Sequence, residues 1–85
     1  MDRQEKITVI LKNNNSTLST NQFEVYDNVG NAPVGTFTLK GGESISIEIG
    51  QDTTGKGSVK IRNSDLDQND WVAMGSIDPG EVITA

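Results

Sequence analysis

The segment Ser44–Gly50 reads SISIEIG, in which every second residue is isoleucine. In an extended strand successive side chains point to opposite faces, so Ile45, Ile47 and Ile49 share one face and the polar residues share the other. Such a pattern is typical of a β-strand with one face in an apolar core and one face in water. The sequence therefore predicts a β-sheet protein.

Weaker copies of this alternation recur along the whole chain. With Ser44–Gly50, the expected strands are Lys6–Lys12, Gln22–Asp27, Val34–Lys40, Gly57–Arg62, Trp71–Met74 and Val82–Thr84. Turn-forming segments separate them at the spacing expected for a sandwich, and no stretch shows helical periodicity. We expect one all-β domain over residues 1–85, a small antiparallel β-sandwich of about seven strands. Its core side chains should include Ile7, Val9, Leu11, Phe23, Val25, Val59 and Ile61.

Two glycines, Gly41 and Gly42, stand between the expected strands Val34–Lys40 and Ser44–Gly50. A short glycine-containing link between two alternating segments is typical of a β-hairpin. The sequence predicts that these two strands pair with each other. The segment Asp78–Glu81, which reads DPGE, is predicted to form a tight turn before the last strand.

The composition excludes several classes of function. The chain has no cysteine and no histidine, which removes disulfides, thiol nucleophiles and imidazole acid–base chemistry. Twelve acidic residues against seven basic ones give a net charge of −5, which disfavours nucleic-acid binding. Carboxylate pairs such as Glu24 with Asp27 have no deep cleft in a chain of 85 residues, so we expect no enzymatic activity.

The N-terminal residues are polar and charged, and no apolar run approaches the length of a transmembrane helix. Together with the lack of cysteine, this predicts a soluble, cytoplasmic protein that does not contact membranes. Export by a route without a signal peptide remains compatible with this reading.

The order of motifs resembles the adhesion-related and fibronectin-type immunoglobulin-like modules of bacteria. The resemblance rests on an Asn-rich turn after the first strand, the strand around FEVY at 23–26, and GGES at 41–44 entering an alternating strand. A second alternating strand at Val59–Ile61 and an Asp/Asn-rich segment at Asn63–Asp70 follow. This resemblance implies an immunoglobulin-like fold and a role in display or adhesion.

The segment Asn63–Asp70 is the most site-like part of the chain. Oxygen-bearing side chains alternate at Asn63, Asp65, Asp67 and Asn69, and calcium is bound by oxygen ligands. The spacing does not match an EF-hand loop, because neither the glycine nor the distal glutamate of that loop is present. The favoured interpretation is a connecting loop whose Asn and Asp side chains bond nearby backbone, with a calcium site as the alternative.

Two aromatic residues adjoin these polar segments. Trp71 follows the acidic loop, and Tyr26 lies near the end of an expected strand. If both rings are exposed, they could stack on a sugar ring and bind carbohydrate. The favoured interpretation is that Trp71 supplies bulk to the core of a small sandwich.

Several apolar residues fall on faces that should be wet, chiefly Ile10, Val72 and Met74. A sandwich with unpaired edges and apolar outer residues tends to associate with itself or to accept a partner strand. We therefore expect a non-catalytic protein-interaction module that forms homo-oligomers or binds a protein partner. The alternative is a small ligand-binding module, lectin-like or calcium-dependent, that uses residues 63–71.

Overall fold

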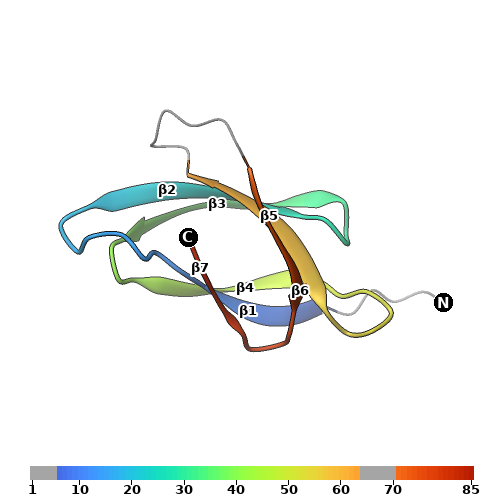
Figure 1. The fold of residues 1–85 in the computed structure, drawn as a ribbon. Coiled ribbons are helices and arrows are strands. Elements are labelled where there is room, and N and C mark those ends of the chain that lie inside the picture. Colours follow the sequence, from blue (N-terminus) through green and yellow to red (C-terminus); the bar gives the residue numbers. More distant parts are fainter. Residues whose placement is uncertain (1–5, 64–70) are drawn as a thin grey trace.

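A computed structural model describes residues 6–63 and 71–85 of the chain (Figure 1). The described residues form seven strands and contain no helix, so none of them builds a helical membrane span. The strands are β1 (Lys6–Lys12), β2 (Thr20–Asp27), β3 (Ala32–Lys40), β4 (Ser44–Gly50), β5 (Gly57–Asn63), β6 (Val72–Ile77) and β7 (Val82–Thr84). The predicted all-β class is confirmed.

The strands form two sheets that lie face to face, as Figure 1 shows. One sheet has the order β4-β1-β7 and the other has the order β3-β2-β5-β6. The pairings β1–β4, β2–β3, β2–β5 and β5–β6 are antiparallel, as expected. The pairing of β7 with β1 is parallel, which the sequence did not predict.

The core lies between the two sheets and is built from the alternating residues. Its buried hydrophobic members are Ile7, Val9, Leu11, Phe23, Val25, Leu39, Ile47, Ile49, Val59, Ile61, Ile77 and Ile83. All seven of the core residues named from the sequence are among them. Ile45 differs from its two companions in β4, because its side chain is 36% exposed near the end of the sandwich.

The predicted hairpin between residues 34–40 and 44–50 is wrong. β3 pairs with β2, whereas β4 pairs with β1 in the opposite sheet, so Gly41 and Gly42 cross between the sheets. Gly42 has a φ of 89°, a conformation that glycine adopts without steric cost. A Cβ on Gly41 would lie 1.8 Å from the carbonyl oxygen of Ser16, so this crossing needs a glycine for space.

Asn13 ties one end of the sandwich together. Its side chain is fully buried, and its amide nitrogen donates to the carbonyl oxygen of Leu39 in β3 at 2.8 Å. Its side-chain oxygen accepts from the backbone nitrogen of Asn15 at 2.9 Å, and its backbone bonds Glu43 and Gly42. The residue that follows β1 is therefore bonded to the opposite sheet and to the crossing at 41–43.

Asp27 joins the two sheets at the other end of the sandwich. Its buried carboxylate accepts hydrogen bonds from the backbone nitrogens of Val29 and Gly30, each at 3.0 Å, and of Gly50 at 2.7 Å. The first two bonds fix the turn between β2 and β3. The third joins β2 to the end of β4 in the other sheet.

Replacing Asp27→Asn should destabilise the fold, because an amide places a donor among three backbone N–H donors. We expect the free energy of unfolding to fall by about 2–3 kcal/mol, the size of lost hydrogen bonds to a buried charged group. Urea unfolding followed by circular dichroism measures it. Glu48→Gln is the control on the exposed face of β4, and an equal loss in both variants would contradict the role of Asp27.

The loop between β4 and β5 is held by Asp52. Its carboxylate accepts from the hydroxyl of Thr54 at 2.6 Å and from the backbone nitrogens of Thr54 and Lys56. These bonds, the hydroxyl bond first, lower the pKa of Asp52 below its ordinary value. An ion pair between Lys56 and Asp78 connects this loop to the turn before β7 and raises the pKa of Lys56.

The lowered pKa of Asp52 has a defined pH consequence. Its stabilising contribution is fully present above the ordinary aspartate pKa and is lost as pH falls through the lower pKa of the folded state. Thr54→Val should move the pKa of Asp52 upward, because the largest cause of its shift is removed. A carboxyl-detected NMR titration tests this, with Thr53→Val as the matched control; an unchanged pKa in Thr54→Val would contradict it.

Candidate interaction site at the open side of the sandwich

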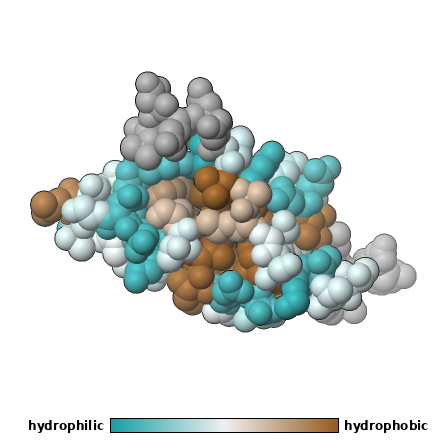
Figure 2. Space-filling view, in the orientation of Figure 1, coloured by the Kyte–Doolittle hydropathy of each residue, from teal (hydrophilic) through white to brown (hydrophobic). Residues whose placement is uncertain are grey.

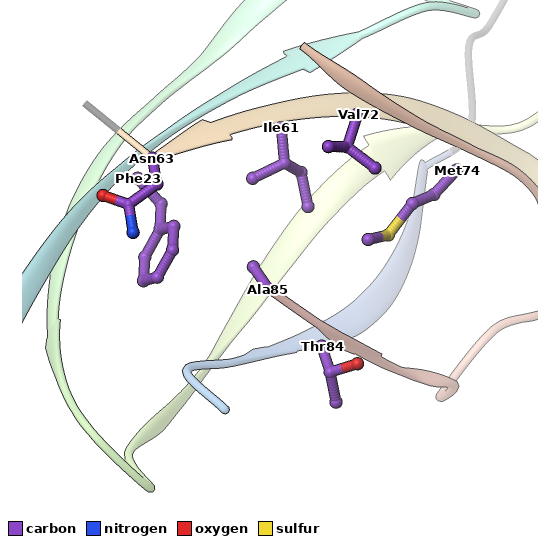
Figure 3. A pocket seen from close by; sticks show the side chains of 7 residues that line it. All are labelled: Phe23, Ile61, Asn63, Val72, Met74, Thr84 and Ala85. Atoms are coloured by element: carbon purple, nitrogen blue, oxygen red, sulfur yellow. The ribbon is translucent and has the colours of Figure 1, made fainter. Parts of the chain in front are cut away.

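In the part of the chain that the structure describes, one side of the sandwich is not closed by side chains from both sheets. β6 and β7 are the end strands of their sheets on this side, and a hollow of about 130 Å³ lies between them. Figure 3 shows the residues that line it: Phe23, Ile61, Asn63, Val72, Met74, Thr84 and Ala85. The hollow is therefore a mostly apolar opening into the core.

The alternation of β5 and β6 puts apolar side chains into this hollow. Ile61 is paired with Val72 and Val59 with Met74, so the β6 side chains share the inner face with buried residues of β5. Val72 is nevertheless 58% exposed. Figure 2 shows apolar surface gathered in the middle of this side, between hydrophilic margins. The inner face of β6 is thus apolar, and it is open to solvent at Val72.

The free edge of β6 is regular at one end and irregular at the other. Its pairing with β5 shifts register between Gly57 and Val59, and Ser76 has a φ of 55°. Such irregularities twist a strand and discourage further pairing. The stretch Val72–Met74 lies before them, and no strand of the described residues pairs with its outer edge. This stretch is the part of the edge best suited to receive another strand.

The structure brings two of the three predicted interface residues together. Val72 and Met74 line the same hollow. Ile10 lies elsewhere, half-buried in β1, where its neighbours in register are Ser46 and Val82 on the outer face of the three-stranded sheet. Val82 is 49% exposed, so Ile10 and Val82 form a separate, smaller apolar spot.

Of the four residues predicted as calcium ligands, only Asn63 lies within the described residues. It ends β5 and lines the apolar hollow. Asp65, Asp67 and Asn69 lie outside the described residues. Within residues 6–63 and 71–85, no three His, Cys, Asp or Glu side chains come together as a metal site.

Trp71 is not a core residue, which corrects the favoured interpretation of the sequence. It precedes Val72, whose side chain faces inward, and alternation puts the indole on the outer face of the four-stranded sheet. There the Lys60 ammonium lies 4.8 Å from the centre of the Tyr26 ring and 5.1 Å from that of Trp71. Tyr26 and Trp71 therefore share a face, with a lysine contacting both rings.

The residues that join the aromatic pair were missed by sequence reasoning. Arg62 lies 4.8 Å from the Trp71 ring centre, and its Nε donates to Glu24 at 2.8 Å. Glu24 thus faces outward while Asp27 is buried, so the two do not form a carboxylate pair. The signal was the polar alternation of Lys60 and Arg62, but it becomes informative only once β5 is known to pair with β2.

The comparisons with known proteins give no relative. The chain matches no protein-family model, no curated protein and no solved structure.

Filling the hollow should stabilise the isolated chain. Ala85 lines it and is held by backbone bonds to Lys12 and Asn14, so Ala85→Leu can extend into open apolar space. We expect the free energy of unfolding to rise by about 0.5–2 kcal/mol, as is common for cavity-filling changes. Urea unfolding measures it. The matched control is Ala73→Leu on the solvent side of β6; a gain equal to that of Ala85→Leu would contradict this account.

Proposed function

We propose that this chain is a non-catalytic protein-interaction module that associates with itself through the open side at β6. The observation that carries the proposal is the exposed Val72 beside an apolar hollow, on a strand edge with no neighbour among the described residues. An unpaired edge strand offers backbone donors and acceptors to a second strand. An apolar hollow behind the edge strand stabilises that pairing, because apolar surface is removed from water when the second strand binds.

Two β6 edges from two copies can pair antiparallel about a twofold axis perpendicular to the sheet. Such an isologous contact uses the same residues of both copies. The two four-stranded sheets would become one continuous sheet, and the inner faces of Val72 and Met74 from each copy would lie on the same side of it. The two hollows would then adjoin, so apolar surface of each copy would be covered by the other.

We further infer that the sandwich is immunoglobulin-like. In that fold the second and fifth strands are neighbours in one sheet, and the third, sixth and seventh are neighbours in the other. If β1 corresponds to the second strand, the orders β4-β1 and β2-β5-β6 follow this arrangement, and β3 extends the larger sheet as in variable-type domains. β7 occupies the position of the first strand but runs parallel to β1.

A small ligand-binding module around residues 63–71 has less support. Asn63 lines an apolar hollow rather than a polar one. Both aromatic rings that would stack on a sugar have the Lys60 ammonium against them. Self-association therefore accounts for more of the described geometry.

Val72→Lys should weaken the association, because a charged side chain would have to be buried at the new contact. In sedimentation velocity the wild-type chain should approach twice its mass of 9.1 kDa with rising concentration. The variant should dissociate at least about tenfold more readily, equivalent to about 1.4 kcal/mol. Circular dichroism confirms that each variant is folded.

Val82→Lys is the matched control, since Val82 is similarly exposed but lies on the other sheet. A wild-type chain that stays monomeric at all concentrations would overturn the proposal, as would equal dissociation of both variants. The chain has no cysteine, so Ala73→Cys supplies a single thiol in β6. Disulfide-linked dimers of this variant are expected if two β6 strands pair near Ala73.

A further inference from the structure

The outer face of the four-stranded sheet differs in charge from the rest of the chain. Its strands carry three outward basic side chains, Lys40, Lys60 and Arg62, against one outward carboxylate, Glu24. The whole chain has a net charge of −5. Acidic residues such as Glu43, Asp52 and Asp78 lie in the connections at the ends of the sandwich. This face is therefore a basic surface on an acidic protein.

Lys60 is the centre of this face. Its side chain is directly opposite Tyr26 in register, and its ammonium lies against the rings of both Tyr26 and Trp71. Cation–π contacts hold the ammonium without neutralising its charge. No carboxylate of the described residues forms an ion pair with it. Lys60 thus presents a fixed positive charge between two half-buried aromatic side chains.

Arg62 extends the same strip along β5. Its guanidinium bonds Glu24, directly opposite in register, and contacts the Trp71 ring. The charge of Arg62 is therefore matched by Glu24, whereas Lys60 has no carboxylate partner among residues 6–63 and 71–85. Trp, Tyr and Arg are also the residues most enriched among those that dominate binding energy at protein interfaces.

We propose that this face binds an acidic, extended segment of a partner protein, with a carboxylate of that segment paired to Lys60. The rings on either side exclude water from part of the ammonium, which strengthens its attraction to a carboxylate. The part of each ring that stays exposed can also contact apolar side chains next to that carboxylate. This site is separate from the β6 edge and does not require the self-association proposed above.

The chemistry favours a peptide over other polyanions. Nucleic acids are bound by clusters of Lys and Arg that contact many phosphates. Beside the aromatic pair, this face offers a single basic side chain without an ion pair in the part of the chain that the structure describes. The chain as a whole is negatively charged, so it repels a long polyanion such as a nucleic acid. A short acidic segment can instead contact this face alone.

An array of random dodecapeptides, probed with the monomeric Val72→Lys variant, tests the proposal. Acidic peptides that contain an aromatic or aliphatic residue should be enriched. The most strongly bound one is then measured by fluorescence anisotropy, beside a copy in which Asp and Glu are replaced by Asn and Gln. Lys60→Gln should weaken binding of the acidic peptide by about tenfold, or about 1.4 kcal/mol.

Lys12→Gln is the matched control, because it removes the same charge from an exposed position on the other sheet. Equal weakening in Lys12→Gln and Lys60→Gln would overturn the proposal, since binding would then follow net charge alone. So would an array without preference for acidic peptides, or selective binding to a glycan array, RNA or anionic vesicles. Loss of self-association without loss of peptide binding would separate this proposal from the function proposed above.

Discussion

Two buried polar side chains determine which side of this sandwich is closed. Asn13 bonds the end of β1 to Leu39 in β3, and Asp27 bonds the end of β2 to Gly50 after the last isoleucine of β4. Both tie the strand pair β1–β4 to the pair β2–β3. A buried carboxylate or amide is stable only when its hydrogen bonds are made, so these ties fix the distance between the two sheets. Among the described residues, the opposite side has no comparable buried tie between β6 and β7, and there the hollow opens.

The parallel strand β7 follows from the same arrangement. The chain leaves β6 in the four-stranded sheet and crosses to the three-stranded sheet through Asp78–Glu81, where Gly80 has a φ of 82°. The flank of β1 opposite β4 accepts it. The backbone nitrogen of Ile10 bonds Glu81, and that of Ala85 bonds Lys12. The strand is short, so it covers only part of the inner face of β5 and β6.

The strands and most of the core could be predicted from alternation alone. Period-two patterns identify which side chains share a face, and Val9, Phe23 and Val59 are buried as that pattern requires. Pairing could not be predicted with the same success, as the link at Gly41-Gly42 shows. A glycine pair fits a hairpin and a crossing between sheets equally well at the level of sequence. The choice depends on the approach of Gly41 to Ser16, a contact between distant residues.

Single residues of the candidate site could be predicted from the sequence, but the way they come together could not. Val72 and Met74 stood out as apolar residues without an evident place in the core, but the hollow beside them requires residues from four strands and the chain end. In the sequence Lys60 is only a polar residue of an alternating strand, because its contacts are with the rings of Tyr26 and Trp71 on other segments. The sequence favours a core position for Trp71, because a core with few hydrophobic residues needs large side chains to fill it. Among residues 6–63 and 71–85, twelve buried hydrophobic residues make the core without the indole, and Phe23 is the aromatic one.

Trp71 and Val72 are adjacent in sequence where β6 begins, and each belongs to a different one of the two proposed surfaces. Trp71 contacts the basic outer face, and Val72 faces the hollow on the inner side. Because consecutive side chains of an extended strand point in opposite directions, a partner strand added at the edge would bury Val72 without covering Lys60. A peptide on the outer face would likewise leave the edge of β6 free. The geometry of a single strand therefore makes the two proposals compatible, because the proposed self-association at the edge of β6 would leave the basic, aromatic face of each copy open to the proposed peptide.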